Sequence, residues 1–184
     1  MIAAIAIGFG RAVRGVWWFR GTHVVRCPEV GRPAGAALDL GHLALTALRG
    51  APSFRIGACS RWPARRDCAQ QCVAQIVQGP RETHPRMLLV RWYAGKACAL
   101  CADRFGPLHR TRERPAVMWP DGRTARWSEI RVEELPQVLA TCQPICRRCH
   151  ITQVFRRLYP GVDGPWTREA ARAAARRAAA ASRA

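Results

Sequence analysis

Two Cys-x-x-Cys pairs constrain this chain of 184 residues more than any other feature of its sequence. The first pair is Cys98 and Cys101, and the second pair is Cys146 and Cys149. Zinc prefers four ligands in a tetrahedron and binds thiolates at about 2.3 Å, so two such pairs supply a complete ligand set. The sequence therefore predicts one zinc site built from these four cysteines. Buried thiols or a disulfide are the alternative.

The segments between and after the two pairs predict an α+β fold. Two predicted strands at 115–119 and 123–127 flank a Pro-Asp-Gly turn, which is typical of a hairpin. An apolar spacing of three and four residues predicts a helix that begins at Cys149 and ends near Tyr159. This order of knuckle, hairpin and helix resembles a small zinc-stabilised treble clef. The apolar face of the helix would consist of Ile151, Val154, Phe155 and Leu158.

Upstream of the knuckle, the sequence predicts a cysteine-containing α/β part. Here we expect a strand at 22–26, a turn-rich loop at 31–35, a helix through 43–48 and a strand at 53–58. A helix of about 11 residues would follow, with Asp67 as its N-cap and with Cys68 and Cys72 on one side. The apolar run at 85–93 fits a helix or a strand. A short helical piece at 133–140 is interrupted near Pro136.

These elements divide the chain into four segments. An apolar N-terminal segment covers 1–21, and the cysteine-containing subdomain covers 22–83. The treble-clef-like zinc module covers 84–162. The tail at 163–184 consists mainly of Ala and Arg, so it has nothing to bury, and we expect a solvated basic helix.

The module also resembles the HNH endonuclease version of this fold. The resemblance rests on Cys98, Cys101 and the Cys-Arg-Arg-Cys-His run at 146–150. It implies His109 as the general base that activates water and His150 as a residue that holds a divalent ion. Arginines fill much of 110–114, where such enzymes place acidic and histidine residues, and arginine neither binds Mg²⁺ nor accepts a proton. The favoured function is therefore a non-catalytic zinc-binding module, with a divergent nuclease as an alternative.

The same run at 146–150 is also a c-type haem attachment motif. Cys146 and Cys149 would form the two thioether bonds, and His150 would be the axial ligand of the iron. The protein would then be an electron carrier. This interpretation leaves Cys98 and Cys101 without a role, so it is a further alternative.

Four other cysteines suggest a second metal site in the N-terminal half. The chain has nine cysteines, and the two pairs account for four of them. The spacing of the second group is irregular, so zinc, an iron–sulfur cluster, disulfides and buried thiols all stay open. Cys142 is left over as the ninth. The second group consists of Cys27, Cys59, Cys68 and Cys72.

The net charge of +18 indicates a polyanionic partner. Nearly all the basic residues are arginines, since Lys96 is the only lysine. We expect contact with nucleic acid or with an acidic protein, and no motif indicates a small-molecule substrate. Partnership with a membrane surface is a further expectation, which depends on the N-terminal segment.

The N-terminal segment alternates apolar runs with arginines. Arg11 and Arg14 interrupt it, whereas a spanning helix needs about 20 consecutive apolar residues. Trp17 and Trp18 beside arginines fit an interfacial segment better, and a buried strand at 16–19 is the alternative. We therefore expect a cytoplasmic protein with peripheral membrane contact. A periplasmic location would follow if the segment is a truncated anchor.

Overall fold

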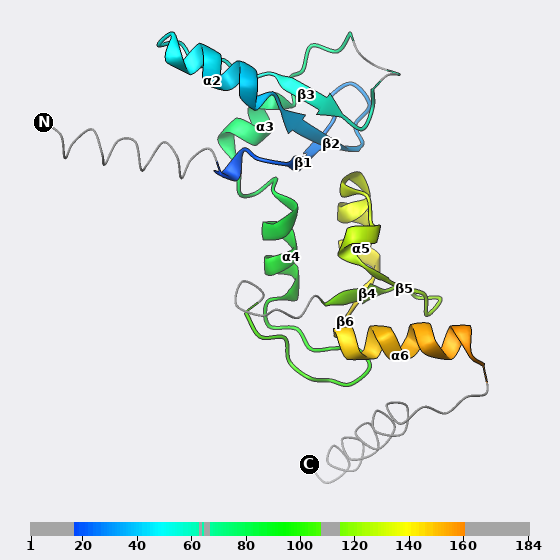
Figure 1. Ribbon diagram of the computed structural model, residues 1–184. Helices are drawn as coiled ribbons and strands as arrows, with labels where there is room; N and C mark the ends of the chain where they lie inside the picture. The colour runs from blue at the N-terminus through cyan, green and yellow to red at the C-terminus, as the bar shows by residue number, and fades with distance from the viewer. Residues whose placement is uncertain (1–16, 63, 65–66, 108–114, 161–184) are drawn as a thin grey trace, which may run out of the picture. The chain divides into compact units, whose positions relative to one another are not determined.

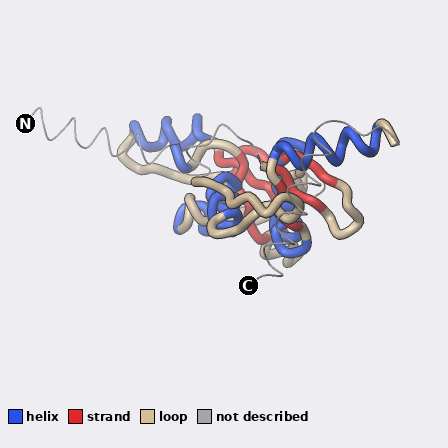
Figure 2. Tube along the Cα trace, turned by 90° about the horizontal axis from the view of Figure 1, so that it is seen from below, coloured by secondary structure: helices blue, strands red, loops and turns tan. Residues whose placement is uncertain are grey.

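The computed structural model describes residues 17–62, 64, 67–107 and 115–160 (Figure 1). It is an α+β protein with two small antiparallel sheets, and much of the trace lies in loops, drawn tan in Figure 2. The chain forms two compact units. The N-terminal unit contains residues up to 88 together with 131–136. The C-terminal unit contains 89–130 and the residues from 137 onward.

The N-terminal unit is built on a three-stranded sheet in the order β1-β2-β3. Strand β1 (Thr22–Arg26) confirms the predicted strand at 22–26, and β3 (Ile56–Cys59) lies at the end of the predicted strand at 53–58. Strand β2 (Pro33–Leu38) was expected to be a loop because of its proline and glycine. Pro33 is the first residue of the strand, where proline is tolerated. A side chain at Gly35 would lie 3.0 Å from Thr22, so glycine permits close packing there.

Two helices accompany this sheet. Helix α2 (Leu40–Leu48) confirms the predicted helix, and Asp39 caps it by accepting a hydrogen bond from the His42 amide at 2.9 Å. Helix α3 (Val73–Gln78) is shorter than predicted. It begins after Cys72, and the chain at Gln70 has a left-handed φ of 52°, which a continuous helix excludes. The prediction that Asp67 caps this helix, with Cys68 and Cys72 on its first turns, is therefore wrong.

The apolar run at 85–93 forms helix α4 (Pro85–Tyr93). The predicted helical piece at 133–140 is present as the 3-10 turn η2 (Val132–Glu134) followed by α5 (Leu135–Thr141). Pro136 does not interrupt the helix. It is the second residue of α5, where the missing amide of proline costs no helical hydrogen bond.

The C-terminal unit contains the second sheet, in the order β5-β4-β6. Strands β4 (Ala116–Met118) and β5 (Thr124–Arg126) form the predicted hairpin, and the short helix η1 (Trp127–Glu129) follows β5. Strand β6 (Gln143–Ile145) pairs with the other edge of β4 and leads directly into α6 (Arg147–Leu158).

Strand β4 separates two small cores in this unit. Ala116 faces a cluster that contains Cys98, Cys101, Ile145 and Cys149. The next residue, Val117, faces the opposite side of the sheet, because successive side chains of a strand alternate. It packs there with Val138 and Cys142, beside Trp92, Trp119, Trp127 and Ile130. The cysteine pairs are therefore part of one of the two cores of the unit.

The predicted apolar face of the last helix is wrong. Ile151, Val154 and Leu158 are exposed, and the buried residues of α6 are Cys149, His150 and Thr152. Trp17 and Trp18 are helical and Phe19 lies in a turn, so the alternative of a strand is wrong at these three residues. Within the described ranges, no helix is both long and apolar enough to cross a membrane. Residues 1–16, His109 and the predicted basic tail lie outside the described residues.

Candidate metal centre

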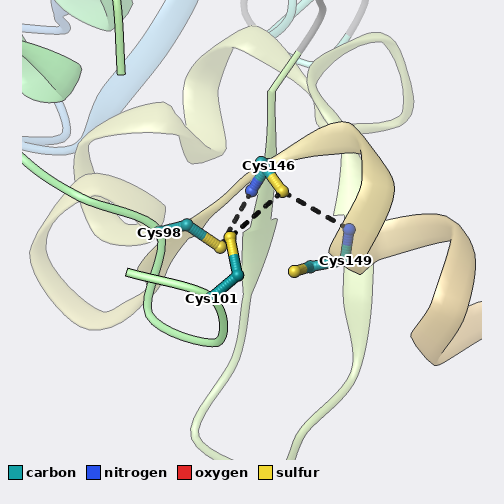
Figure 3. Close-up of side chains that lie close together, drawn as sticks. All are labelled: Cys98, Cys101, Cys146 and Cys149. Carbon is teal, nitrogen blue, oxygen red and sulfur yellow. Dashed lines mark hydrogen bonds between the residues drawn. The ribbon is translucent and has the colours of Figure 1, made fainter. Parts of the chain in front are cut away.

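The two Cys-x-x-Cys pairs meet in the C-terminal unit. The Sγ atoms of Cys98, Cys101, Cys146 and Cys149 all lie within 4.8 Å of one another (Figure 3). The Sγ atoms of Cys101 and Cys146 are 3.7 Å apart. Four sulfurs at about 2.3 Å from one zinc ion would be about 3.8 Å from one another. All four cysteines are free thiols, so the cluster has the ligand set and the spacing of a metal site.

The first pair lies on a tight turn before β4. The Cys98 amide donates to the Asp103 carbonyl at 2.9 Å, and the Ala102 amide donates to the Cys98 carbonyl at 2.8 Å. An isolated bridge between Ala97 and Arg104 closes the turn. Ala102 has a φ of 57°, which directs the chain back after the second cysteine. The turn is joined to β6 by the Ala99 amide, which donates to the Pro144 carbonyl at 2.9 Å.

The second pair lies at the start of α6. Cys146 is the N-cap residue, and its Sγ accepts a hydrogen bond from the Cys149 amide at 3.4 Å. The Cys146 amide in turn donates to the Sγ of Cys98 at 3.3 Å (Figure 3). Amide donors at a helix N-terminus favour the thiolate form of nearby cysteines. The backbone of this helix start therefore stabilises negative charge on the sulfurs.

Hydrogen bonds within the cluster make Cys98, Cys101 and Cys149 compete for protons. Hydrogen bonds from Cys146 and Cys149 lower the pKa of Cys98 far below its usual value. Burial, together with hydrogen bonds to Asp103 and Cys98, raises the pKa of Cys101 to about 12. Hydrogen bonds to Cys146 and Cys98 raise the pKa of Cys149. A divalent cation would remove this competition, because its charge stabilises all four thiolates together.

Sequence reasoning missed two polar contacts near this centre, one made by Asp103 and the other by Thr124. The thiol of Cys101 lies 3.3 Å from Oδ2 of Asp103, two residues later in the turn. His150 is buried beside Cys149, and its Nδ1 lies 2.9 Å from the hydroxyl of Thr124 on β5. Burial lowers the pKa of His150, which favours the neutral imidazole. No motif marks Asp103 or Thr124, since both contacts depend on the folded turn and hairpin.

The second group of cysteines is arranged differently. Cys27, Cys59, Cys68 and Cys72 all line one cavity of the N-terminal unit. Among the described residues, only the first set brings three or more ligand atoms as close together as a bound ion requires. Cys142 belongs to neither group. It is buried beside Val117 and Val138, and its sulfur lies 3.8 Å from the Thr141 hydroxyl.

The ligand set limits the chemistry of the first centre. A catalytic zinc site keeps one position for water or substrate, whereas four thiolates complete the coordination. Neither His nor a carboxylate belongs to the cluster in the described part of the chain. The cluster is therefore compatible with a metal-binding module. Comparisons with protein-family models, with curated proteins and with solved structures find no match for this chain.

Proposed function

We propose that the protein is a non-catalytic zinc module in which Cys98, Cys101, Cys146 and Cys149 bind one structural zinc ion. The convergence of four sulfurs within 4.8 Å carries this proposal. The order of elements around the site supports a treble-clef-like arrangement. A turn holds the first pair, a hairpin follows, and the second pair begins a helix.

One observation favours zinc over covalently bound haem. Haem attachment would use Cys146 and Cys149 as thioethers, but here their sulfurs lie against those of the other pair. An HNH-type nuclease stays the second candidate, because His150 is buried directly beside the cysteine centre. Its proposed base, His109, lies outside the described residues.

For the partner, we propose nucleic acid. Helix α6 exposes Arg147, Arg148, Arg156 and Arg157. Among the described residues, none of these four is within ion-pair distance of a carboxylate, whereas Arg123, Arg126 and Arg131 all are. Arginine binds phosphate groups through bidentate hydrogen bonds, so unpaired arginines on one helix suit a phosphate backbone. The net charge of +18 would add long-range attraction.

Metal analysis of cysteine variants tests the zinc site. We expect Cys98→Ser and Cys149→Ser each to lose about one zinc ion per chain relative to the wild type, as measured by mass spectrometry of the metal. Cys142→Ser is the matched control, since it removes a buried cysteine outside the cluster and should keep the wild-type zinc content. Equal zinc contents in all four proteins would refute the site. A Soret band that survives denaturation would establish haem instead.

Salt-dependent binding tests the partner. We expect binding to a fluorescent RNA or DNA oligonucleotide whose log Kd rises linearly with log salt concentration, as counterion release requires. Arg156→Gln with Arg157→Gln should weaken binding and reduce the salt slope by about one to two. Arg123→Gln with Arg131→Gln removes the same charge from ion-paired positions and should change the slope less. Equal losses in both double variants would exclude α6 as the contact surface. No binding would favour an acidic protein partner.

Plasmid cleavage separates the module from the nuclease. We expect no cleavage with added Mg²⁺. Cleavage that His109→Ala abolishes would establish the alternative.

A further inference from the structure

The turn at Cys27 has the same backbone hydrogen bonds as the metal-binding turn at Cys98. The Cys27 amide donates to the carbonyl of Arg32, five residues later, at 2.9 Å. The carbonyl of Cys27 accepts from the amide of Gly31, four residues later, at 2.8 Å. At Cys98 the corresponding distances, to Asp103 and Ala102, are 2.9 and 2.8 Å.

The resemblance of the two turns extends to their ends and to their backbone angles. The residue before each cysteine pairs with the residue six positions after that cysteine. These pairs are Arg26 with Pro33 and Ala97 with Arg104. The residue four positions after each cysteine is left-handed, with φ 68° at Gly31 and 57° at Ala102. The N-terminal unit therefore contains a turn that presents Cys27 in the same way as the first centre presents Cys98.

The sheet brings Cys59 to the face on which Cys27 lies. Cys59 is opposite Ala36 across the β2–β3 pair, and directly opposed residues share a face. Ala34 lies on the same face two residues earlier, and it is opposite Val25 on β1. Cys27 is two residues beyond Val25, so it continues this face. Ala34 is buried and small, and it lines the cavity together with the two cysteines.

Side chains of the following loop and helix hold Cys68 and Cys72 over that space. The Ile56 amide on β3 donates to the side chain of Gln70 at 2.7 Å. Gln75 of α3 forms two hydrogen bonds with the backbone of Arg26, at 2.9 and 2.7 Å. One contact fixes the loop between the two cysteines, and the other fixes α3 beside the end of β1. Cys72, directly before α3, is buried in the core of the unit.

The space enclosed in this way is a cavity of about 60 Å³ that all four thiols line. A cavity needs about 10–15 Å³ by this measure to hold one water molecule, so this one has room for an ion. The four sulfurs are less tightly gathered around this cavity than those of the first centre are around their own midpoint.

We propose that Cys27, Cys59, Cys68 and Cys72 form a second tetrathiolate zinc site, which closes the cavity of the N-terminal unit when zinc binds. The four thiols would move inward onto the ion, and each would release its proton to the solvent and bind zinc as a thiolate. The site lies in the N-terminal unit, so this proposal does not depend on the first centre or on any nucleic-acid partner.

Zinc content of the full chain under reducing conditions tests this proposal. We expect about two zinc ions per wild-type chain and about one in Cys59→Ser and in Cys68→Ser. Both residues are only half-buried, so these substitutions disturb packing less than a change at Cys72. Cys142→Ser is the control and should keep about two. Cys98→Ser should keep about one, and Cys59→Ser combined with Cys98→Ser should keep none.

Cobalt provides a second readout that does not require every variant to be fully stable. In the Cys98→Ser, Cys149→Ser background, added Co²⁺ should produce the thiolate charge-transfer and visible bands of a tetrahedral thiolate complex. Cys59→Ser or Cys68→Ser in that background should abolish the bands.

The outcomes distinguish the two zinc sites. One zinc per wild-type chain that Cys98→Ser removes and Cys59→Ser retains would overturn the second site and leave the first intact. One zinc per wild-type chain that Cys59→Ser removes and Cys98→Ser retains would refute the first site and leave the second intact. A brown protein whose iron and sulfide are lost in Cys59→Ser would replace zinc by an iron–sulfur cluster at this position and overturn the proposal as stated.

Discussion

At the residue scale, Tyr93 links several elements of the C-terminal unit through its hydroxyl and its ring. It is buried, and its hydroxyl donates to the Ala116 carbonyl at 2.6 Å and accepts from the Trp127 indole at 3.0 Å. Burial raises the pKa of Tyr93, so the hydroxyl keeps its proton at all ordinary pH values. Its ring packs edge to face with that of Phe105, with the ring centroids 4.8 Å apart. Tyr93 thus joins α4 to β4, the strand beside the cysteine cluster.

Removing this hydroxyl should destabilise the protein. Tyr93→Phe leaves the Ala116 carbonyl and the Trp127 indole without their partner, and we expect a loss of about 1–3 kcal/mol in the free energy of unfolding. Urea denaturation followed by tryptophan fluorescence measures it. Tyr159 is the matched control, because it is exposed, and Tyr159→Phe should cost less than about 0.5 kcal/mol. Equal effects of the two substitutions would contradict the role of Tyr93.

His23 makes a second residue-scale prediction, which concerns pH. It is fully buried on β1, where Nδ1 lies 2.9 Å from the Thr83 hydroxyl and Nε2 has no hydrogen-bond partner within the described structure. Burial, and then the nearby His84, lowers the pKa of His23 from 6.5. Below pH 6.5 the unfolded chain gains a proton that the folded chain does not bind. The stability from neutral His23 is therefore present above pH 6.5 and is lost as the pH falls through the folded pKa.

The measurement compares His23→Gln with the wild type over a pH series in saturating zinc. We expect the free energy of unfolding of the wild type to fall more steeply below pH 6.5, by up to about 1.4 kcal/mol per pH unit for one proton. The variant should lose this part of the slope even if its stability is lower throughout. His84 and His150 also have lowered pKa values, so some slope should remain in the variant. Parallel curves for the two proteins would contradict the prediction.

At the element scale, the turn that holds Cys98 and Cys101 contains a residue in an unfavourable conformation. Ala102 has a φ of 57°, and a side chain in this left-handed region costs about 1–2 kcal/mol. Glycine avoids this cost but loses about 0.5–1 kcal/mol of chain entropy on folding. We therefore expect Ala102→Gly to stabilise the zinc-bound protein by about 0.5 kcal/mol, as measured by denaturation in saturating zinc.

Ala99 provides the control for this substitution. It lies in the same turn with an ordinary negative φ, so Ala99→Gly brings only the entropy loss and should destabilise the protein. If both glycine variants shift stability in the same direction, the left-handed backbone at Ala102 carries no cost. The turn at Cys27 avoids this cost, because its residue equivalent to Ala102 is already a glycine, Gly31.

Helix α6 shows the limit of periodicity as a guide to packing. The apolar spacing correctly predicts a helix, but Ile151, Val154 and Leu158 are exposed. The buried side instead contains the polar residues His150 and Thr152, whose hydrogen bonds satisfy their side chains. A pattern that weighs only hydrophobicity assigns such residues to the exposed side. The buried side of α6 is the side on which Cys149 lies, together with His150 and Thr152.

At the scale of the whole molecule, both sheets are small and the buried cores contain many cysteines. Small domains bury too little apolar surface to be stable without a disulfide, a metal or a partner. All nine cysteines are free thiols, so we expect metal ions to supply much of the stability.

Chelation should therefore unfold much of the chain. Zinc removal under reducing conditions should abolish the near-ultraviolet circular dichroism signal of the tryptophans and the cooperative thermal transition. Added Zn²⁺ should restore both, whereas Mg²⁺ should not, because thiolates bind Mg²⁺ weakly. Cys142→Ser should behave like the wild type. A chelated protein that melts cooperatively at the temperature of the untreated protein would show that metal is not structural here.

The sequence by itself determined the four cysteines of the first cluster, the hairpin and the helices α2 and α6. Cys-x-x-Cys spacing, Pro-Asp-Gly turn chemistry and helical periodicity are local properties, so they are visible without a fold. Strand β2, the start of α3 and the buried side of α6 were decided by the tertiary structure. Each depends on contacts between distant segments, such as Gln70 with Ile56 or His150 with Thr124.

The second cysteine group shows most clearly which properties are visible in the sequence and which depend on the fold. The count of nine cysteines indicates that four remain after the two pairs and Cys142 are set aside. Only the fold shows that Cys27 lies on a turn equivalent to that of Cys98, or that all four line one cavity. Irregular spacing carries no signal, because strand pairing and side-chain contacts bring these residues together. Local chemistry thus determined which residues can bind a metal, and long-range packing decided where they meet.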